Sequence, residues 1–362
     1  MRAQERRRLR ALPGALRTGL PLAPALALAL ALTTAACSTS GDAAPAPTST
    51  SRGASSTPAS SARPALTLEE AGRALKEILA ADEVLGSAVP TVLADRHHLL
   101  KQARDGHLAL IQAAYETAEA TGEKPSPHTW GEPRLLVPRV QQGVLWFAAV
   151  VDRRDSSGQD RAAVLTLVRQ GQGDWQVSSL SLLDAELPEV ALDDEGYVTA
   201  LAEDDMTVAI SPRLMAPLHA TTAEEGTAGF AAGLIAEGPH TTAHAAEIAA
   251  ARTEEKREGC LGYDSIFAAA GYPVHALRTA DGGALVMYSL IRTTTRTIKV
   301  DPCAPYIEIP RQARGLTSEP YARDELRTVE TQQYVSVVPA KGSGELARVI
   351  GYRGGITRVN VS

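Results

Sequence analysis

The sequence predicts an α+β fold made of two tandem modules, in each of which helices precede a curved antiparallel sheet. Three observations predict it. Apolar residues recur at helical spacing at the start of each half, strand-like runs separated by short turns follow them, and both halves show the same order. Helices followed by a run of strands favour α+β over an alternating α/β arrangement. The halves share this order but have little residue identity.

In the first half, two helices should precede four strands. One apolar face extends over residues 68–85, and a second helical stretch covers 91–121, where Gly122 ends it. A turn-rich segment, 125–133, separates the helices from the strands. Short breaks rich in glycine and serine make the remainder a hairpin meander. Its strands are expected at residues 134–140, 144–152, 162–169 and 175–183.

The second half repeats this order. Helices are expected at 222–236 and 242–258, with a short helical piece at 263–270. Clear hairpin turns at 281–283 and 341–344 separate strand-like runs. The strands are expected at residues 273–279, 284–298, 328–339, 346–352 and 356–361.

The amino-terminal residues have the three regions of a signal peptide, here 1–36. Six arginines precede an apolar run of leucine and alanine over 20–32, and small residues occupy 33–36. The basic start favours retention on the cytoplasmic side, and small residues suit a signal peptidase. The apolar run is shorter than the roughly 20 residues of a membrane-spanning helix. We therefore expect export by the general secretory route.

The sequence Thr34-Ala35-Ala36-Cys37 resembles the lipobox of bacterial lipoproteins, although Thr34 stands where leucine is usual. The resemblance implies diacylglycerol on Cys37 and cleavage before it. It places the protein on the outer face of the cytoplasmic membrane, where two or three acyl chains anchor a protein stably. An ordinary cleaved signal with a leftover cysteine and an uncleaved membrane anchor are the alternatives.

The mature chain should be strongly acidic and divided into a tether and two modules. Cleavage removes six arginines and one glutamate, which moves the formal charge from −6 to −11 and argues against nucleic acid as a partner. Residues 37–65 comprise the lipidated cysteine and a disordered Ser/Thr/Ala/Pro tether. The first module is expected at 66–190, an acidic joint at 191–215 and the second module at 216–362.

Cys260 and Cys303 are the two cysteines of the folded part. Because the exported compartment is oxidising, a disulfide is the simplest interpretation, and two buried free thiols are the alternative. The bridge would tie the helices of the second module to a long excursion between two strands, residues 299–327. That excursion otherwise has little to hold it in place.

This order of elements resembles the cone-shaped α+β roll of the nuclear-transport-factor-two-like superfamily, a cystatin-like roll. In that fold a long helix packs on a bent sheet and encloses a pocket. The layout from lipobox to tandem modules also resembles uncharacterised actinobacterial lipoproteins known only as domains of unknown function. The superfamily includes enzymes and non-enzymes alike, so the resemblance assigns no catalytic residue.

No catalytic or metal-binding motif is recognisable. His240 and His244 have helical spacing, but no glutamate follows His240 as a zinc hydrolase requires. His97, His98 and His107 are too spread along a helix to form a cluster. Roll-type enzymes often place an Asp–His or Asp–Tyr pair in the cone, and the candidates are Asp264 with His275 and Asp95 with Tyr115.

The sequence therefore favours a non-enzymatic surface lipoprotein that binds a small-molecule ligand or an envelope protein, without cofactor or metal. A cell-envelope enzyme with an unrecognised site in a cone-shaped pocket is the alternative. The pocket discriminates between them. A deep cavity with a carboxylate in contact with a histidine favours an enzyme, and an apolar or filled cone favours binding or a structural role.

Overall fold

The structure is a computed structural model that describes residues 63–87, 93–122, 127–141, 143–300 and 303–362. The predicted signal peptide, Cys37 and nearly all of the tether lie outside these residues. Residues 60–362 form one compact unit. The predicted α+β class is confirmed, because helices accompany a large antiparallel sheet.

In the described residues, nine strands form one antiparallel sheet in the order β1-β2-β3-β4-β11-β10-β7-β5, and β6 also pairs with β7. The strands come from both halves of the chain. They are β1 (His128–Leu136), β2 (Leu145–Asp155), β3 (Asp160–Arg169), β4 (Gln176–Leu183), β5 (Leu261–Ala269), β6 (His275–Arg278), β7 (Ala284–Ile298), β10 (Glu325–Val338) and β11 (Arg348–Val361).

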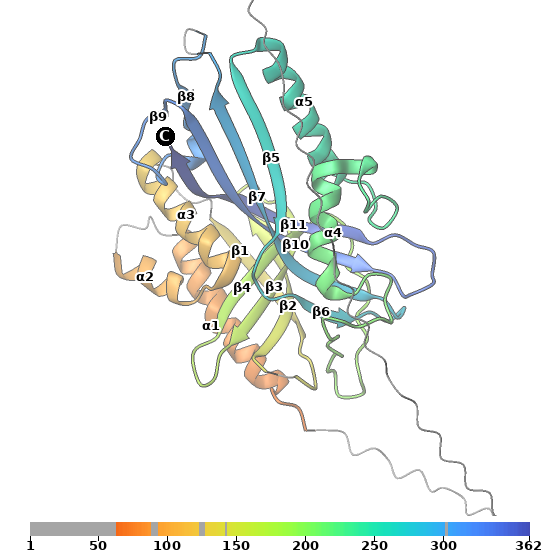
Figure 1. Ribbon diagram of the computed structural model, residues 1–362. Coiled ribbons are helices and arrows are strands. Elements are labelled where there is room, and N and C mark those ends of the chain that lie inside the picture. Colours follow the sequence, from red (N-terminus) through yellow and green to blue (C-terminus); the bar gives the residue numbers. More distant parts are fainter. Residues whose placement is uncertain (1–62, 88–92, 123–126, 142, 301–302) are drawn as a thin grey trace, which may run out of the picture. The chain divides into compact units, whose positions relative to one another are not determined.

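The helices cover different parts of this sheet (Figure 1). Helix α1 (Leu68–Ser87) packs on β1, and α3 (Asp105–Thr121) packs on β4, β10 and β11. Helices α4 (Pro212–Glu225) and α5 (Thr242–Glu258) pack on β5. The short α2 (Leu93–Lys101) contacts α1 and α3.

The two halves are joined by strand pairing and by a shared core. Leu182 and Leu183 of β4 pair with Tyr352 and Gly351 of β11. A buried apolar cluster also combines side chains from β2 and β3 with side chains from β7 and β10. It includes Trp146, Val164, Leu285, Met287, Val335 and Val337. Where the sequence predicts a sheet for each half, the strands of both halves therefore belong to one sheet.

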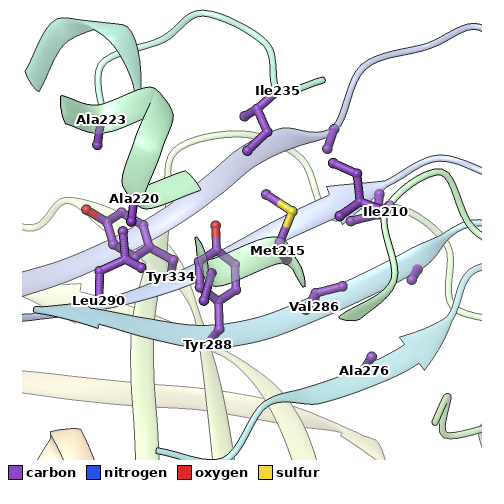
Figure 2. Close-up of a cluster of buried hydrophobic side chains, with 14 of the residues drawn as sticks. Ile210, Met215, Ala220, Ala223, Ile235, Ala276, Val286, Tyr288, Leu290 and Tyr334 are labelled. Atoms are coloured by element: carbon purple, nitrogen blue, oxygen red, sulfur yellow. The ribbon is translucent and has the colours of Figure 1, made fainter. Parts of the chain in front are cut away.

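A second apolar cluster fixes α4 against the sheet (Figure 2). Met215 and Ala220 of α4 are buried against Tyr288 of β7 and Tyr334 of β10. The Tyr288 hydroxyl also contacts His219 Nδ1 and Ser336 Oγ, each at 2.8 Å. The polar atoms inside this core therefore have hydrogen-bond partners, as buried polar groups require.

Several predicted boundaries in the first half are wrong. The helical stretch 91–121 is two helices, because the chain leaves helical geometry at 102–104, where Ala103 bridges to β4. Gly122 ends α3 as predicted, with a left-handed φ of 67°. The segment 125–133 is not only turn, since β1 already begins at His128.

The second half contains three corrections. The predicted helical piece 263–270 is β5, whose nine residues all pair with β7. The helix predicted at 222–236 is wrong over most of its length, because α4 starts earlier at Pro212 and ends at Glu225, and a short 3-10 helix and turns follow it. The two strands predicted at 346–352 and 356–361 are the single strand β11, because β10 pairs with it through the glycines between them.

The predicted joint, 191–215, is ordered by contacts with both halves. Arg139 pairs with Asp193 at 2.5 Å, and Arg278 pairs with Asp205 at 3.2 Å. Short backbone bridges join Val198 to Pro138 and Ala200 to Leu277. The acidic residues therefore hold the joint against neighbouring arginines.

The excursion between β7 and β10 has a small core of its own, contrary to the expectation that little else holds it. It contains the two-stranded pair β8 (Ile307–Glu308) and β9 (Tyr321–Ala322) and the short helix η2 (Arg311–Ala313). Ile307 and Ile309 are buried in an apolar cluster with the end of β11. A disulfide joins Cys260 to Cys303 at the base of this excursion.

Candidate functional site

A cavity of about 640 Å³ lies between α3 and the sheet. One wall is α3, and strands β1, β2, β4 and β11 supply most of the other wall. Helix η2 contributes to the rim. The residues that line this cavity include Asp82, Leu110, Ile111, Ala118, His128, Trp130, Arg153, Leu180, Arg311, Arg353 and Ile356.

Much of the lining is apolar. Leu110 and Ile111 lie on α3, and Leu180 and Ile356 face the cavity from the sheet. Gly354 and Gly355 of β11 also line it, and glycine adds no side-chain volume there. This lining suits an apolar ligand body, as in most small-molecule sites.

Four polar side chains from three elements meet in the cavity wall. Asp82 of α1 contacts His128 Nε2 at 2.7 Å, and the indole N–H of Trp130 donates to the same carboxylate oxygen at 3.0 Å. Arg153 of β2 lies 3.1 Å from His128 Nδ1. Burial alone would raise the pKa of Asp82, but the hydrogen bond and charge of His128 and the Trp130 hydrogen bond lower it overall.

These contacts fix the proton on His128. A guanidinium can only donate, so Nδ1 must accept from Arg153 and the proton must lie on Nε2, facing Asp82. Both ring nitrogens are then occupied. His128 orients Arg153 and Asp82 and has no free lone pair to offer a substrate.

Arg353 of β11 differs from Arg153. It lines the cavity, and among the described residues its side chain has no hydrogen bond or ion pair. Burial, with the nearby charge of Arg153, lowers its pKa to about 10 although Asp82 acts in the opposite direction, so it stays charged at neutral pH. His107 of α3, which is 5% exposed, adds a buried Nδ1 without a partner in the described part of the chain.

The rim is held closely against α3. Thr117 donates to the carbonyl oxygen of Gln312 at 3.1 Å. A Cβ at Gly315 would lie 2.0 Å from the carbonyl oxygen of Glu116, so only glycine permits this approach. The excursion that carries η2 is therefore fixed against the helix that forms the cavity wall.

The Asp–His and Asp–Tyr pairs predicted from sequence do not form this site. Asp264 on β5 pairs with Arg252 at 2.6 Å. His275 on β6 packs on Trp146, with ring centroids 4.4 Å apart, so the predicted pairing of Asp264 with His275 is wrong. Tyr115 does line the cavity, whereas the side chain of Asp95 lies outside the described residues.

His240 and His244 are not on one helix face, because α5 begins at Thr242. His240 instead contacts Asp184 at 2.7 Å, and His244 lies 3.8 Å from Glu247. His97 and His98 are exposed on α2, while His107 alone of that group reaches the cavity. The described residues contain no group of three or more His, Cys, Asp or Glu side chains placed to hold a metal ion.

The residues that form the site were missed by sequence reasoning. Asp82, His128, Arg153 and Arg353 are dispersed along the chain, and their spacing carries no motif. One local signal existed. His128 and Trp130 are two residues apart, so they share a face if the segment is a strand.

The family model described as "Domain of unknown function (DUF8094)" matches residues 62–360. Two Streptomyces coelicolor proteins are similar to this chain. One, named uncharacterized lipoprotein SCO6871, is 32% identical over 60% of this chain and 61% of its own length. The other, named uncharacterized lipoprotein SCO2278, is 26% identical over 81% of this chain and 86% of its own length. No solved structure matches the chain.

The chain therefore spans somewhat under two thirds of the first of these relatives. Both relatives carry the name lipoprotein. None of the helices in the described ranges is both long enough and apolar enough to cross a membrane.

Proposed function

Since the chain belongs to the DUF8094 family of unknown function, we propose that it is a lipid-anchored protein that binds a small organic ligand in the cavity beside α3. The anchor is a lipid on Cys37, on the outer face of the cytoplasmic membrane. The observation that carries the binding proposal is the cavity itself. It is about 640 Å³ in volume, with an apolar lining and a few convergent polar groups.

The roll resemblance agrees with this location. In the nuclear-transport-factor-two-like fold the pocket lies between a long helix and a bent sheet, and here α3 and the sheet line the cavity. The division into modules at 66–190 and 216–362 remains a prediction, as does the tether over 37–65.

An envelope enzyme is the second candidate, and the Asp82–His128 contact inside the cavity is the observation that favours it. A general base must have a nitrogen free to take a proton from substrate. Arg153 occupies Nδ1 and Asp82 occupies Nε2, so catalysis by His128 would first require one of them to leave. We therefore place binding ahead of catalysis.

Filling the cavity should weaken ligand binding. Ala118→Phe puts a ring into the space beside α3, and an overfilled site costs about 1–3 kcal/mol, or about 5- to 150-fold in affinity. The probe is a photoreactive dodecan-1-ol carrying a diazirine. The lipoprotein is irradiated in micelles, and mass spectrometry identifies the labelled peptides. Their position in the chain distinguishes probe bound in the cavity from probe dissolved in the micelle.

The matched control is Ala120→Phe, the same change at an exposed position of α3 away from the cavity. We expect labelled α3 and β11 peptides in the wild type and in this control, and much weaker labelling of them in Ala118→Phe at the same probe concentration. Absence of cavity labelling in the wild type, or equal labelling in all three proteins, would contradict the binding proposal.

Replacing the lipidated cysteine should detach the protein. Cys37→Ser removes the thiol that accepts diacylglycerol, so the chain should either leave the membrane fraction or remain as an uncleaved precursor. Fractionation, with intact mass measurement of the amino terminus, checks this. A Cys37→Ser protein that is processed and membrane-bound like the wild type would refute the lipoprotein anchor.

A further inference from the structure

The charged groups around the cavity are unbalanced. Among the described residues its inner lining contains two arginines, Arg153 and Arg353, and a single carboxylate, Asp82, while Arg311 lies at an exposed position of the rim. The chain as a whole is acidic, with a formal charge of −6. A cationic excess enclosed in an acidic protein needs a cause, because buried like charges are costly unless an anion compensates them.

Asp82 can compensate only one of these two positive charges. One of its oxygens already accepts hydrogen bonds from His128 and Trp130, which hold the carboxylate beside β1. Arg153 is likewise engaged, with His128 at 3.1 Å and the Trp130 ring 5.9 Å from its guanidinium carbon. The tautomer of His128 keeps both groups in place.

Arg353 is the group left for a ligand. Its side chain lines the cavity and has no partner among the described residues. Its guanidinium offers five N–H donors in a planar fork that fits a carboxylate, sulfonate or phosphate. His107 Nδ1, buried on the opposite wall without a partner, is a second polar atom that a ligand can satisfy.

We propose that the cavity takes an amphiphilic organic anion, whose acidic head binds Arg353 and whose apolar body lies along Leu110, Ile111 and Ile356. This inference rests on the proposed function and adds the chemical class of the ligand. The head and the body are recognised by different parts of the lining, so they can be varied separately. Cationic heads are disfavoured by the arginines, and uncharged heads leave Arg353 unpaired.

The test uses three diazirine probes with the same chain: dodecanoate, dodecan-1-ol and dodecylammonium. Their relative affinities are measured by competition for labelling of the cavity peptides in the lipoprotein. We expect dodecanoate to bind best and dodecylammonium worst. Arg353→Met should weaken dodecanoate by about 30-fold or more, as for loss of one partner of a buried charge pair.

Dodecan-1-ol provides the internal control for folding. Its binding to Arg353→Met should be unchanged or stronger, because no charge then needs to be desolvated. Arg353→Lys should retain part of the preference for the anion, since the charge stays but the planar fork is lost. Arg358→Met, at an exposed position of the same strand, should leave all three affinities unaltered.

The outcomes separate the two proposals. Equal affinity for the three heads, or an anion preference that survives Arg353→Met, overturns the anion inference while the cavity remains a binding site. Failure of every probe to label the cavity removes the proposed function and the inference with it.

Discussion

Lowering the pH from 7.5 to 5.0 should destabilise the folded protein by several kcal/mol. The cause is four histidines whose pKa burial lowers far below the ordinary value of about 6.5. The pKa falls to about 3 for His107 and His219 and to about 4 for His244 and His275.

The direction follows from proton uptake by the unfolded chain. Below pH about 6.5 the histidines of the unfolded chain take up protons, while those of the folded chain stay neutral until pH about 4 or lower. Stability is therefore complete above the unfolded pKa and is lost as the pH falls through that window. At pH 5.0 each histidine accounts for about 2 kcal/mol of the loss.

His275→Phe isolates one of these contributions. The His275 ring packs at a tilt on Trp146, and its Nε2 has no partner in the described part of the chain, so phenylalanine preserves the ring contact and removes the titrating group. Urea unfolding at pH 7.5 and 5.0 should show a loss about 2 kcal/mol smaller than in the wild type. His97→Phe, at an exposed position on α2, is the control and should retain the full loss.

Two results would refute this account. One is a free energy of unfolding that does not change between pH 7.5 and 5.0. The other is a His275→Phe protein that loses as much stability as the wild type over the same range.

The buried strands could be predicted from the sequence because their apolar runs are long and bounded by turns. Strand β7 begins and ends at the predicted residues, Ala284–Ile298. The segment at 263–270 failed because its alanines favour helix, while pairing with β7 places it at the edge of the sheet. There the pairing with β7 outweighed the local preference for helix. The glycines inside β11 led to the wrong prediction of two strands, because β10 pairs with β11 across them.

The site could not be predicted, because its residues come together only through the order of the strands. Asp82 and His128 are separated by 46 residues, and Arg353 belongs to the last strand. That strand reaches the cavity because β11 pairs with β4, a connection between the two halves that the separate-sheet prediction did not contain. Arg353 differs from the other arginines of the cavity in lying there without a hydrogen-bond partner among the described residues, and this cannot be inferred from the sequence.

The disulfide should stabilise the fold chiefly by constraining the unfolded chain. Cys260 and Cys303 are 43 residues apart, and their bond closes the loop that contains β5, β6 and β7. The pairing of Leu261 with Ile298 already holds the same ends together in the folded protein. The bond acts chiefly on the unfolded chain, whose entropy it lowers, so that pairing does not diminish its contribution.

Replacing both cysteines by alanine should therefore lower the free energy of unfolding by about 3–4 kcal/mol. Urea unfolding of the exported protein measures the loss, and reduction of the wild type with dithiothreitol should reproduce it. Reduction should leave the Cys260→Ala/Cys303→Ala protein unchanged, which controls for other effects of the reductant. Because the excursion has its own apolar cluster and contacts α3 through Gln312, ligand labelling of the cavity should survive the substitution. Non-reducing mass spectrometry that finds both thiols free and alkylatable in exported wild-type protein would remove the bridge and this account of its contribution.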